Sequence, residues 1–167
     1  MRVLVSAASR HGATAEIAER IGEGLRQRLA SASITVLPPE RVGHVDGFDA
    51  YVLGSAVYMG HWISSAMELI ENNADAFAGR PVWLFSSGPI GDPPKPNEQP
   101  VDVGQAVRVT AAREHKLFSG RLDRSLLGFG ERAIAVAFRA PEGDFRDWPA
   151  IEAWAGTIAD ALKEVSA

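Results

Sequence analysis

Apolar, β-rich runs alternate with segments of helical periodicity along most of this chain. Such alternation is typical of a parallel sheet with helices packed on both faces. We therefore expect an α/β fold, a doubly wound parallel sheet of five strands. The strand-like runs lie at residues 2–7, 34–37, 49–57, 82–87 and 115–119.

The segments between these runs carry helical patterns. The first places Ile17, Ile21, Leu25 and Leu29 four residues apart, which predicts one buried stripe along a helix. Asp147 can cap a last helix, with Pro149 in its first turn. The apolar face of that helix is then expected to comprise Ile151, Trp154, Ala155, Ile158, Leu162 and Val165. Further helices are predicted at residues 62–77, 101–110 and 131–139.

Prolines mark two interruptions in this pattern. Pro38 and Pro39 follow the second strand and cannot donate to a ladder, so that strand suits an edge of the sheet. Residues 88–100 are rich in proline and are predicted to form an irregular loop.

The composition narrows the class of protein. The length of 167 residues fits a single domain, residues 1–167, and the net charge of −4 argues against a nucleic-acid binder. The chain has no cysteine, which excludes disulfides, thiolate catalysis and iron–sulfur clusters. The sequence has neither a basic leader followed by an apolar stretch nor an uncharged run of about 18 residues. We expect a cytoplasmic protein without an integral membrane segment.

The stretch AASRHGAT, residues 7–14, joins the first strand to the first helix. It lacks the lysine of the nucleoside-triphosphate loop and the three glycines of the dinucleotide fingerprint. Its hydroxyls, at Ser9 and Thr14, and its backbone N–H groups at a helix N-terminus can still hold a phosphate, with Arg10 as a candidate charged contact. The alternative is a plain turn in which Thr14 only caps the helix.

Two further loops are expected at the same edge of the sheet, because ligands of such sheets bind at the carboxyl ends of the strands. After the third strand, GSAVYMGHW offers Gly60 for a close backbone approach and Tyr58 or Trp62 for stacking on a flat ring. These aromatic residues could equally pack against the next helix. After the fourth strand, SSGPIG could line the other edge of the ring or be a simple strand exit.

The stretch VSAASRHGATAEIA resembles the phosphate loop and first helix of flavodoxins. DAYVLGSAVYMGHW and GERAIAVAFRAPEGDFRDWPAI are similar to the flavodoxin-domain family that includes the menaquinone-dependent protoporphyrinogen dehydrogenase. The resemblance covers almost the whole chain and implies a flavodoxin-like fold of strand order 2-1-3-4-5 that binds FMN non-covalently. By position, the cofactor-binding residues are Ser9, Arg10, His11, Gly12, Ala13, Thr14, Ser55, Ala56, Val57, Tyr58, Met59, Gly60, Ser87, Gly88, Pro89, Ile90 and Gly91. Ala13 stands where many flavodoxins have asparagine, so one side-chain contact to the phosphate is missing.

The resemblance leaves three functions open. The first is an FMN-dependent oxidoreductase that passes electrons between a substrate, such as a porphyrinogen, and a quinone. The second is an electron carrier that serves a redox partner, and the third is a flavin-free interaction module. A phosphate-receiver domain is excluded by the absence of carboxylates after the first and third strands.

Individual catalytic and metal-binding residues are not indicated by the sequence. The four histidines do not show metal-ligand spacing, and we expect each to be a surface or loop residue, with His61 a candidate for proton transfer near the ring. In residues 121–146, the apolar side chains of Leu126, Leu127, Phe129, Ile134 and Phe138 could shape a hydrophobic substrate or quinone site, face a partner, or pack in the core.

Overall fold

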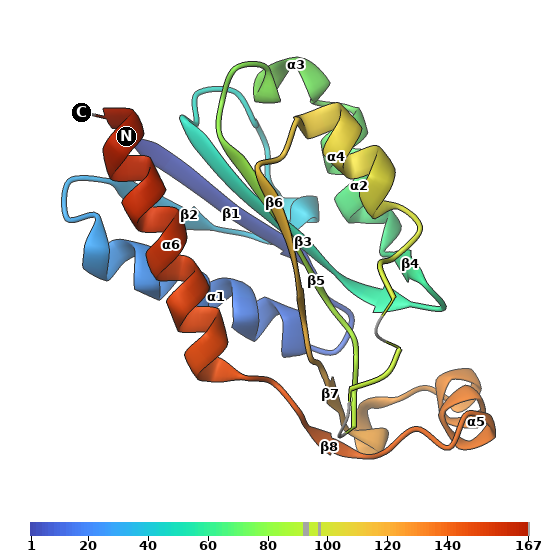
Figure 1. Cartoon of the computed structure of the whole chain (residues 1–167). Coiled ribbons are helices and arrows are strands. Elements are labelled where there is room, and N and C mark those ends of the chain that lie inside the picture. Colours follow the sequence, from blue (N-terminus) through green and yellow to red (C-terminus); the bar gives the residue numbers. More distant parts are fainter. Residues whose placement is uncertain (92–93, 97, 167) are drawn as a thin grey trace.

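A parallel sheet of five strands lies at the centre of the computed structural model, which describes residues 1–91, 94–96 and 98–166 (Figure 1). The strand order is β2-β1-β3-β5-β6. This confirms the predicted order 2-1-3-4-5, because β4 is only a short antiparallel addition to β3. β2 lies at an edge, as Pro38 and Pro39 predict. The strands are β1 (Arg2–Ala8), β2 (Ser33–Val36), β3 (Ala50–Tyr58), β4 (His61–Trp62), β5 (Val82–Ser87) and β6 (Glu114–Phe118).

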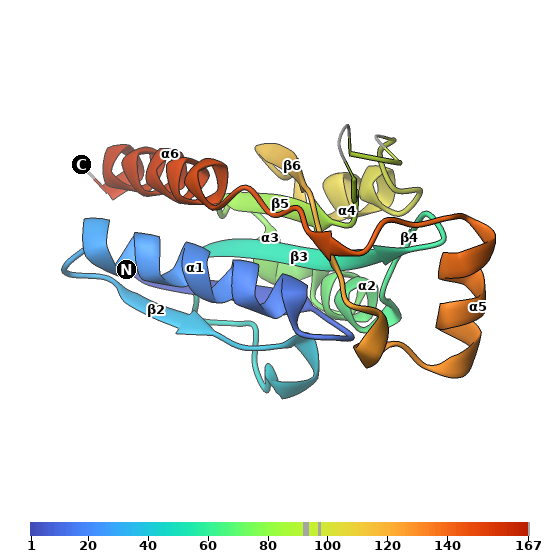
Figure 2. The ribbon, with the colours of Figure 1, turned by 90° about the horizontal axis from the view of Figure 1, so that it is seen from below.

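Helices cover both faces of the sheet (Figure 2). One face packs against α1 (Ala13–Arg28) and α6 (Trp148–Ser166), and the other against α2 (Ser64–Glu71), α3 (Ala74–Phe77) and α4 (Val103–Thr110). Each face of the sheet has its own apolar core, and alternate residues of β1 point into the two cores. Val3 and Val5 pack toward α1, whereas Leu4 packs on the opposite face. Both apolar cores are therefore anchored on the same central strands.

The apolar stripe predicted for the first helix is confirmed, because Ile17, Ile21 and Leu25 are fully buried. The predicted cap of the last helix is also present, since the N–H of Ala150 donates to Oδ1 of Asp147 at 3.0 Å. The apolar face of α6 is buried as far as Leu162. Val165 was wrongly assigned to that face, because it lies in the last turn and is 56% exposed.

The single helix predicted at residues 62–77 is wrong. Trp62 belongs to β4, where it pairs with Val57, so the helix begins only at Ser64. It ends at Glu71 and is followed by the separate short helix α3. The side-chain amide of Asn73 donates to the carbonyl of Leu69 at 2.7 Å, which satisfies an acceptor at the end of α2 and divides the two helices.

Residues 121–146 form an excursion between β6 and α6 (Figure 1). Its ends pair as the antiparallel strands β7 (Arg121–Leu122) and β8 (Gly143–Asp144). Between them lie the 3-10 helix η2 (Arg124–Leu126) and the helix α5 (Phe129–Ala137), which confirms the predicted short helix but begins two residues earlier. We call residues 121–146 the excursion segment.

The remaining connections are irregular or short. A 3-10 helix, η1 (Pro39–Arg41), follows β2. The predicted proline-rich loop is irregular apart from one bridge between Ile90 and Lys95, and its residues 92, 93 and 97 lie outside the described residues. Within the described chain, none of the helices has the length and apolar character needed to cross a membrane.

Candidate functional site

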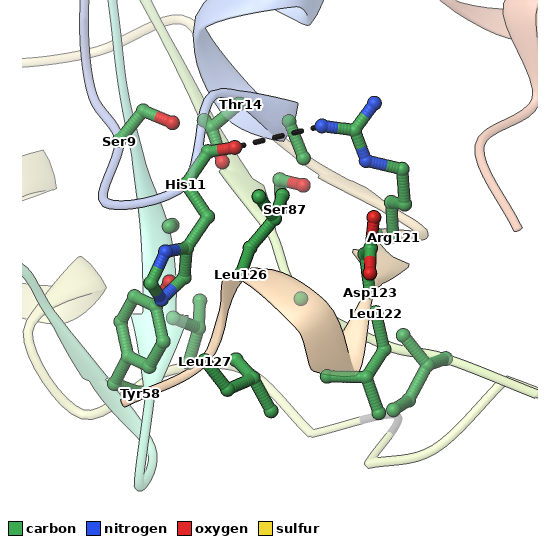
Figure 3. Close-up of a pocket in the computed structure, with 16 residues that line it drawn as sticks. Ser9, His11, Thr14, Tyr58, Ser87, Arg121, Leu122, Asp123, Leu126 and Leu127 are labelled. Carbon is green, nitrogen blue, oxygen red and sulfur yellow. Dashed lines mark hydrogen bonds between the residues drawn. The ribbon is translucent and has the colours of Figure 1, made fainter. Parts of the chain in front are cut away.

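A cavity of about 190 Å³ opens at the carboxyl ends of β1, β3 and β5 (Figure 3). This is the edge of the sheet where the sequence predicted a ligand site. The lining comes from the three predicted loops and from the beginning of the excursion segment. Its residues are Ser9, His11, Ala13, Thr14, Ala56, Val57, Tyr58, Ser87, Gly88, Ile90, Gly120, Arg121, Leu122, Asp123, Leu126 and Leu127.

The loop after β1 turns sharply into α1. Gly12 has φ of 90°, a left-handed conformation that costs a residue with a Cβ roughly 1–2 kcal/mol. Its N–H donates to Oγ of Ser9 at 3.1 Å, which closes the turn. The backbone of this loop therefore requires a glycine at position 12, and the hydroxyl of Ser9 keeps its own proton for another acceptor.

Thr14 lies in the first turn of α1 and lines the cavity. It is only 2% exposed, yet its hydroxyl forms no hydrogen bond with any residue that the structure describes. The N-cap of α1 is Gly12, and no side chain caps the helix, so the alternative that Thr14 is a helix cap is wrong. A hydroxyl at the cavity wall without a protein partner is available to an acceptor in the cavity.

The carboxyl ends of β3 and β5 lie side by side at the cavity, because Ala56 pairs with Ser87. Ala56, Val57 and Tyr58 of β3 contribute to the lining, together with Ser87 of β5 and with Gly88 and Ile90 of the loop that follows it. Burial raises the pKa of the Tyr58 phenol, so the ring presents a neutral hydroxyl near pH 7. Small residues of the two strand ends and the half-buried ring of Tyr58 thus form part of the lining, and Figure 3 shows Tyr58 at the end of the cavity away from Arg121.

Other residues predicted in these loops do not line the cavity. Trp62 is 5% exposed and its indole N–H donates to Oγ of Ser86 at 2.7 Å, so the packing alternative holds for Trp62. Ser55 is fully buried, and its hydroxyl joins the N–H of Ile63 to the carbonyl of Ala56. The remaining predicted residues outside the lining are Arg10, Gly12, Met59, Gly60, Pro89 and Gly91.

Arg10 points toward the excursion segment. Its Nη1 lies 3.2 Å from Oε1 of Glu131 on α5, and its Cζ lies 4.3 Å from the centre of the Tyr58 ring. Nε2 of His11 lies 3.0 Å from the same carboxylate oxygen. Hydrogen bonds from the Gly128 N–H, from His11 and from Arg10 lower the pKa of Glu131 from 4.5 to about 2. Glu131 is therefore ionised and attaches α5 to the loop after β1.

Two arginines of the excursion segment hold the beginning of α1. Nη2 of Arg121 donates to the carbonyl of His11 at 3.5 Å, and Nη1 of Arg146 donates to that of Ala13 at 3.2 Å. Both guanidinium groups also contact Glu16, which lowers the pKa of that carboxyl. Both arginines thereby attach the excursion segment to the beginning of α1.

The excursion segment contributes residues to the cavity lining, and the sequence indicated only some of them. Leu126 and Leu127 were proposed for an apolar substrate site, and both contact the cavity. The contributions of Arg121, Leu122 and Asp123 were not foreseen. No local pattern signals them, because their position depends on the pairing of β7 (Arg121–Leu122) with β8 (Gly143–Asp144), which is distant in the sequence.

The outer surface of α5 is apolar. Phe129 is 93% exposed, Phe138 71% and Val136 63%, and Leu126 and Ile134 are each almost half exposed. The alternative that Leu126, Phe129, Ile134 and Phe138 pack in the core is therefore wrong. Leu127, which belonged to the same set, is half-buried. Exposed large apolar side chains that gather on α5 and on the residues flanking it are typical of an interaction surface.

The histidines are dispersed. No group of three or more potential metal ligands occurs among the described residues. His61 is exposed, with Nδ1 3.1 Å from Asp102. The expectation of a surface or loop position is wrong for His115, which lies half-buried on β6 with Nε2 2.7 Å from Oγ of Ser86.

A family model for the flavodoxin domain matches residues 4–147. The chain belongs to the flavodoxin domain family. The match begins in β1 and extends through the excursion segment to the cap of α6, so the flavodoxin domain includes all of the loops that line the cavity. A comparison with curated protein sequences finds no match.

Solved structures share the fold of this flavodoxin domain. A mutant flavodoxin from Pseudomonas aeruginosa aligns with 98% of this chain and 99% of its own, with 19% identity and a TM-score of 0.60. An azoreductase from Bacillus anthracis aligns over 96% of this chain and 99% of its own, with 11% identity and a TM-score of 0.59. The rubredoxin oxygen:oxidoreductase of Desulfovibrio gigas has 12% identity and a TM-score of 0.65 over 98% of this chain, which spans only 36% of that protein.

Proposed function

We propose that this flavodoxin domain binds FMN non-covalently and acts as a redox protein. The observation that carries the proposal is Thr14, a nearly buried residue that lines the cavity and whose hydroxyl has no hydrogen-bond partner among the described residues. It lies at the N-terminus of α1, where a phosphate is favoured by the helix dipole and the free N–H groups.

The residues present fit FMN at both ends of the cavity. We assign the phosphate to Ser9, Gly12, Ala13 and Thr14, and the ring to the loops 55–60 and 87–91, with Tyr58 against one face of it. Arg10 and His11 lie beside the ring end, where they contact Glu131. Bound FMN would supply one- and two-electron transfer, and the protein would orient it and limit its contact with water.

The cavity is small for such a ligand. Pockets for small molecules typically measure roughly 300–1,000 Å³, whereas this cavity measures about 190 Å³. Leu126 and Leu127 form the part of the lining that belongs to the excursion segment. We infer that this part of the segment moves outward to admit the ring.

The excursion segment favours an enzyme over a simple carrier. Its apolar surface, formed by Leu126, Phe129, Ile134, Val136 and Phe138, adjoins residues that line the cavity. An apolar electron donor or acceptor could reach the ring there. We therefore propose an oxidoreductase of the protoporphyrinogen dehydrogenase (quinone) type in the cytoplasm. A flavodoxin-type carrier, with this surface facing a redox partner, is the second candidate, and a flavin-free interaction module the third.

Flavin binding is tested by titrating the purified protein, stripped of any flavin, with FMN while following flavin fluorescence. We expect saturable quenching at one FMN per chain. Fluorescence that stays equal to that of free FMN at micromolar protein would support the flavin-free module.

Enzyme and carrier are separated by anaerobic mixing of the FMN-loaded protein with a porphyrinogen and a quinone. An enzyme reduces the quinone in many turnovers per flavin, with the porphyrinogen consumed in proportion. A carrier shows no catalytic consumption of either compound, although its reduced flavin can still be oxidised by a protein partner.

A further inference from the structure

Arg121 has a position that the assignment of the phosphate loop does not include. It lies on β7, in the excursion segment, yet it lines the same cavity as Ser9, Ala13 and Thr14. Figure 3 shows its guanidinium at the end of the cavity where Thr14 lies, opposite the end that holds Tyr58. Its side chain is 25% exposed. A cation is thus placed beside the N-terminus of α1.

The guanidinium of Arg121 is held in place by the protein. Nη1 lies 3.2 Å from Oε1 of Glu16, and Nη2 donates to the carbonyl of His11. A guanidinium carries five N–H donors, so these two contacts leave donors for a further acceptor. Arg146 contacts the same Glu16 but is only 3% exposed and does not line the cavity. Arg121 is therefore the arginine of this pair that meets a ligand.

Arg10, the cation indicated by the sequence, has a different position. Its guanidinium contacts Glu131 and lies over the ring of Tyr58. Both contacts are at the end of the cavity assigned to the flavin ring.

We propose that Arg121 recognises the phosphate of the cofactor and makes the site select FMN over riboflavin, its unphosphorylated form. The inference rests on the proposed function. A phosphomonoester carries a charge of about −1.5 to −2 at neutral pH, and a charge-assisted contact with a guanidinium is roughly twice as strong as a neutral hydrogen bond. The contact replaces the side-chain hydrogen bond that is missing at Ala13.

The experiment compares the affinities of FMN and riboflavin, measured by flavin fluorescence, in the wild-type protein and in Arg121→Gln. We expect the variant to lose FMN affinity about tenfold or more and to keep its riboflavin affinity within about twofold. Arg124→Gln is the matched control, because Arg124 is exposed on the same segment and does not line the cavity. It should bind both flavins as the wild type does.

Arg10→Gln separates the two candidate cations. We expect it to leave the ratio of FMN to riboflavin affinity unchanged. A fall in that ratio in Arg10→Gln, without one in Arg121→Gln, would overturn the proposal. An equal loss of both flavins in Arg121→Gln would also overturn it, because the arginine would then act only by holding α1.

Two further outcomes are distinguishable. If the wild type binds neither flavin, the proposed function fails, and the role of Arg121 fails with it. If Arg121→Gln does not fold, the same ratio is measured in Arg121→Lys, which keeps the charge but loses the planar fork. We expect the ratio to fall at least about threefold there, and an unchanged ratio contradicts the proposal.

Discussion

Oε1 of Glu131 lies 3.0 Å from Nε2 of His11, although the two residues are 120 positions apart in the sequence. The contact joins α5 to the loop after β1, and Arg10 binds the same carboxylate. The excursion segment is therefore attached to the very loop that we assign to the cofactor. An outward movement of Leu126 and Leu127 that admits a flavin ring therefore has to strain or break the contacts of Glu131 with His11 and Arg10.

Replacing Glu131 by glutamine should loosen the excursion segment. The neutral amide cannot form an ion pair with Arg10 and is a weaker hydrogen-bond acceptor for both Arg10 and His11. We expect faster amide hydrogen exchange across residues 124–138, measured by mass spectrometry, with little change in β1, β3 and β5. Glu164→Gln, on the exposed surface of α6, is the control. Unchanged exchange in α5 would show that other contacts hold the segment.

Replacing Thr14 by valine should weaken FMN binding by roughly 1–2 kcal/mol, because the phosphate loses one hydroxyl donor. Thr14→Ser keeps the hydroxyl and should bind nearly as tightly as the wild type. Affinity is measured by quenching of flavin fluorescence. If valine and threonine give the same affinity, the hydroxyl does not meet the phosphate.

His115 should make stability dependent on pH. Burial lowers the pKa of His115 below its ordinary value of 6.5, so the unfolded chain binds the proton more readily than the folded one. The contribution is fully present above pH 6.5 and is lost as the pH falls below it. We expect the free energy of unfolding, from urea titrations, to drop less between pH 7.5 and about pH 5.5 in His115→Gln than in the wild type.

The exposed His44 serves as the control for that measurement. His44→Gln should retain the wild-type dependence on pH. Identical slopes in the wild type and His115→Gln would mean that burial of His115 does not keep its imidazole neutral in the folded protein.

Replacing Phe129 and Phe138 by serine should leave folding almost unchanged, since both side chains are mostly exposed. The melting temperature is expected to shift by only a few degrees. If α5 receives an apolar donor or acceptor, the double variant should raise KM for a quinone while the affinity for FMN stays the same. A KM for the quinone equal to that of the wild type would mean that Phe129 and Phe138 do not bind this substrate.

The sequence predicted the sheet well because buried strands and amphipathic helices have distinct periods. The stripe of Ile17, Ile21 and Leu25 is an example, since all three side chains are buried as its spacing requires. Trp62 was misplaced because a two-residue strand has too few positions to show alternation. The hairpin pairing of Trp62 with Val57 became evident only in three dimensions.

Three loops of the candidate site were predicted correctly because each follows a strand that is recognisable in the sequence. Arg121 and Asp123 were not, because the chain returns to the cavity only when β7 pairs with β8. The requirement for glycine at position 54 could not be predicted from the local sequence either. A Cβ there would lie 2.4 Å from the Phe85 ring on the neighbouring strand, so the need for glycine arises from tertiary packing.

The visible spectrum of the purified protein shows whether the chain binds FMN. The spectrum is recorded on the protein as isolated, and again after incubation with FMN and removal of free flavin by gel filtration. We expect a yellow protein with flavin absorbance at one FMN per chain, bleached by dithionite and restored by air. A colourless, folded protein that retains no FMN after incubation would contradict this expectation.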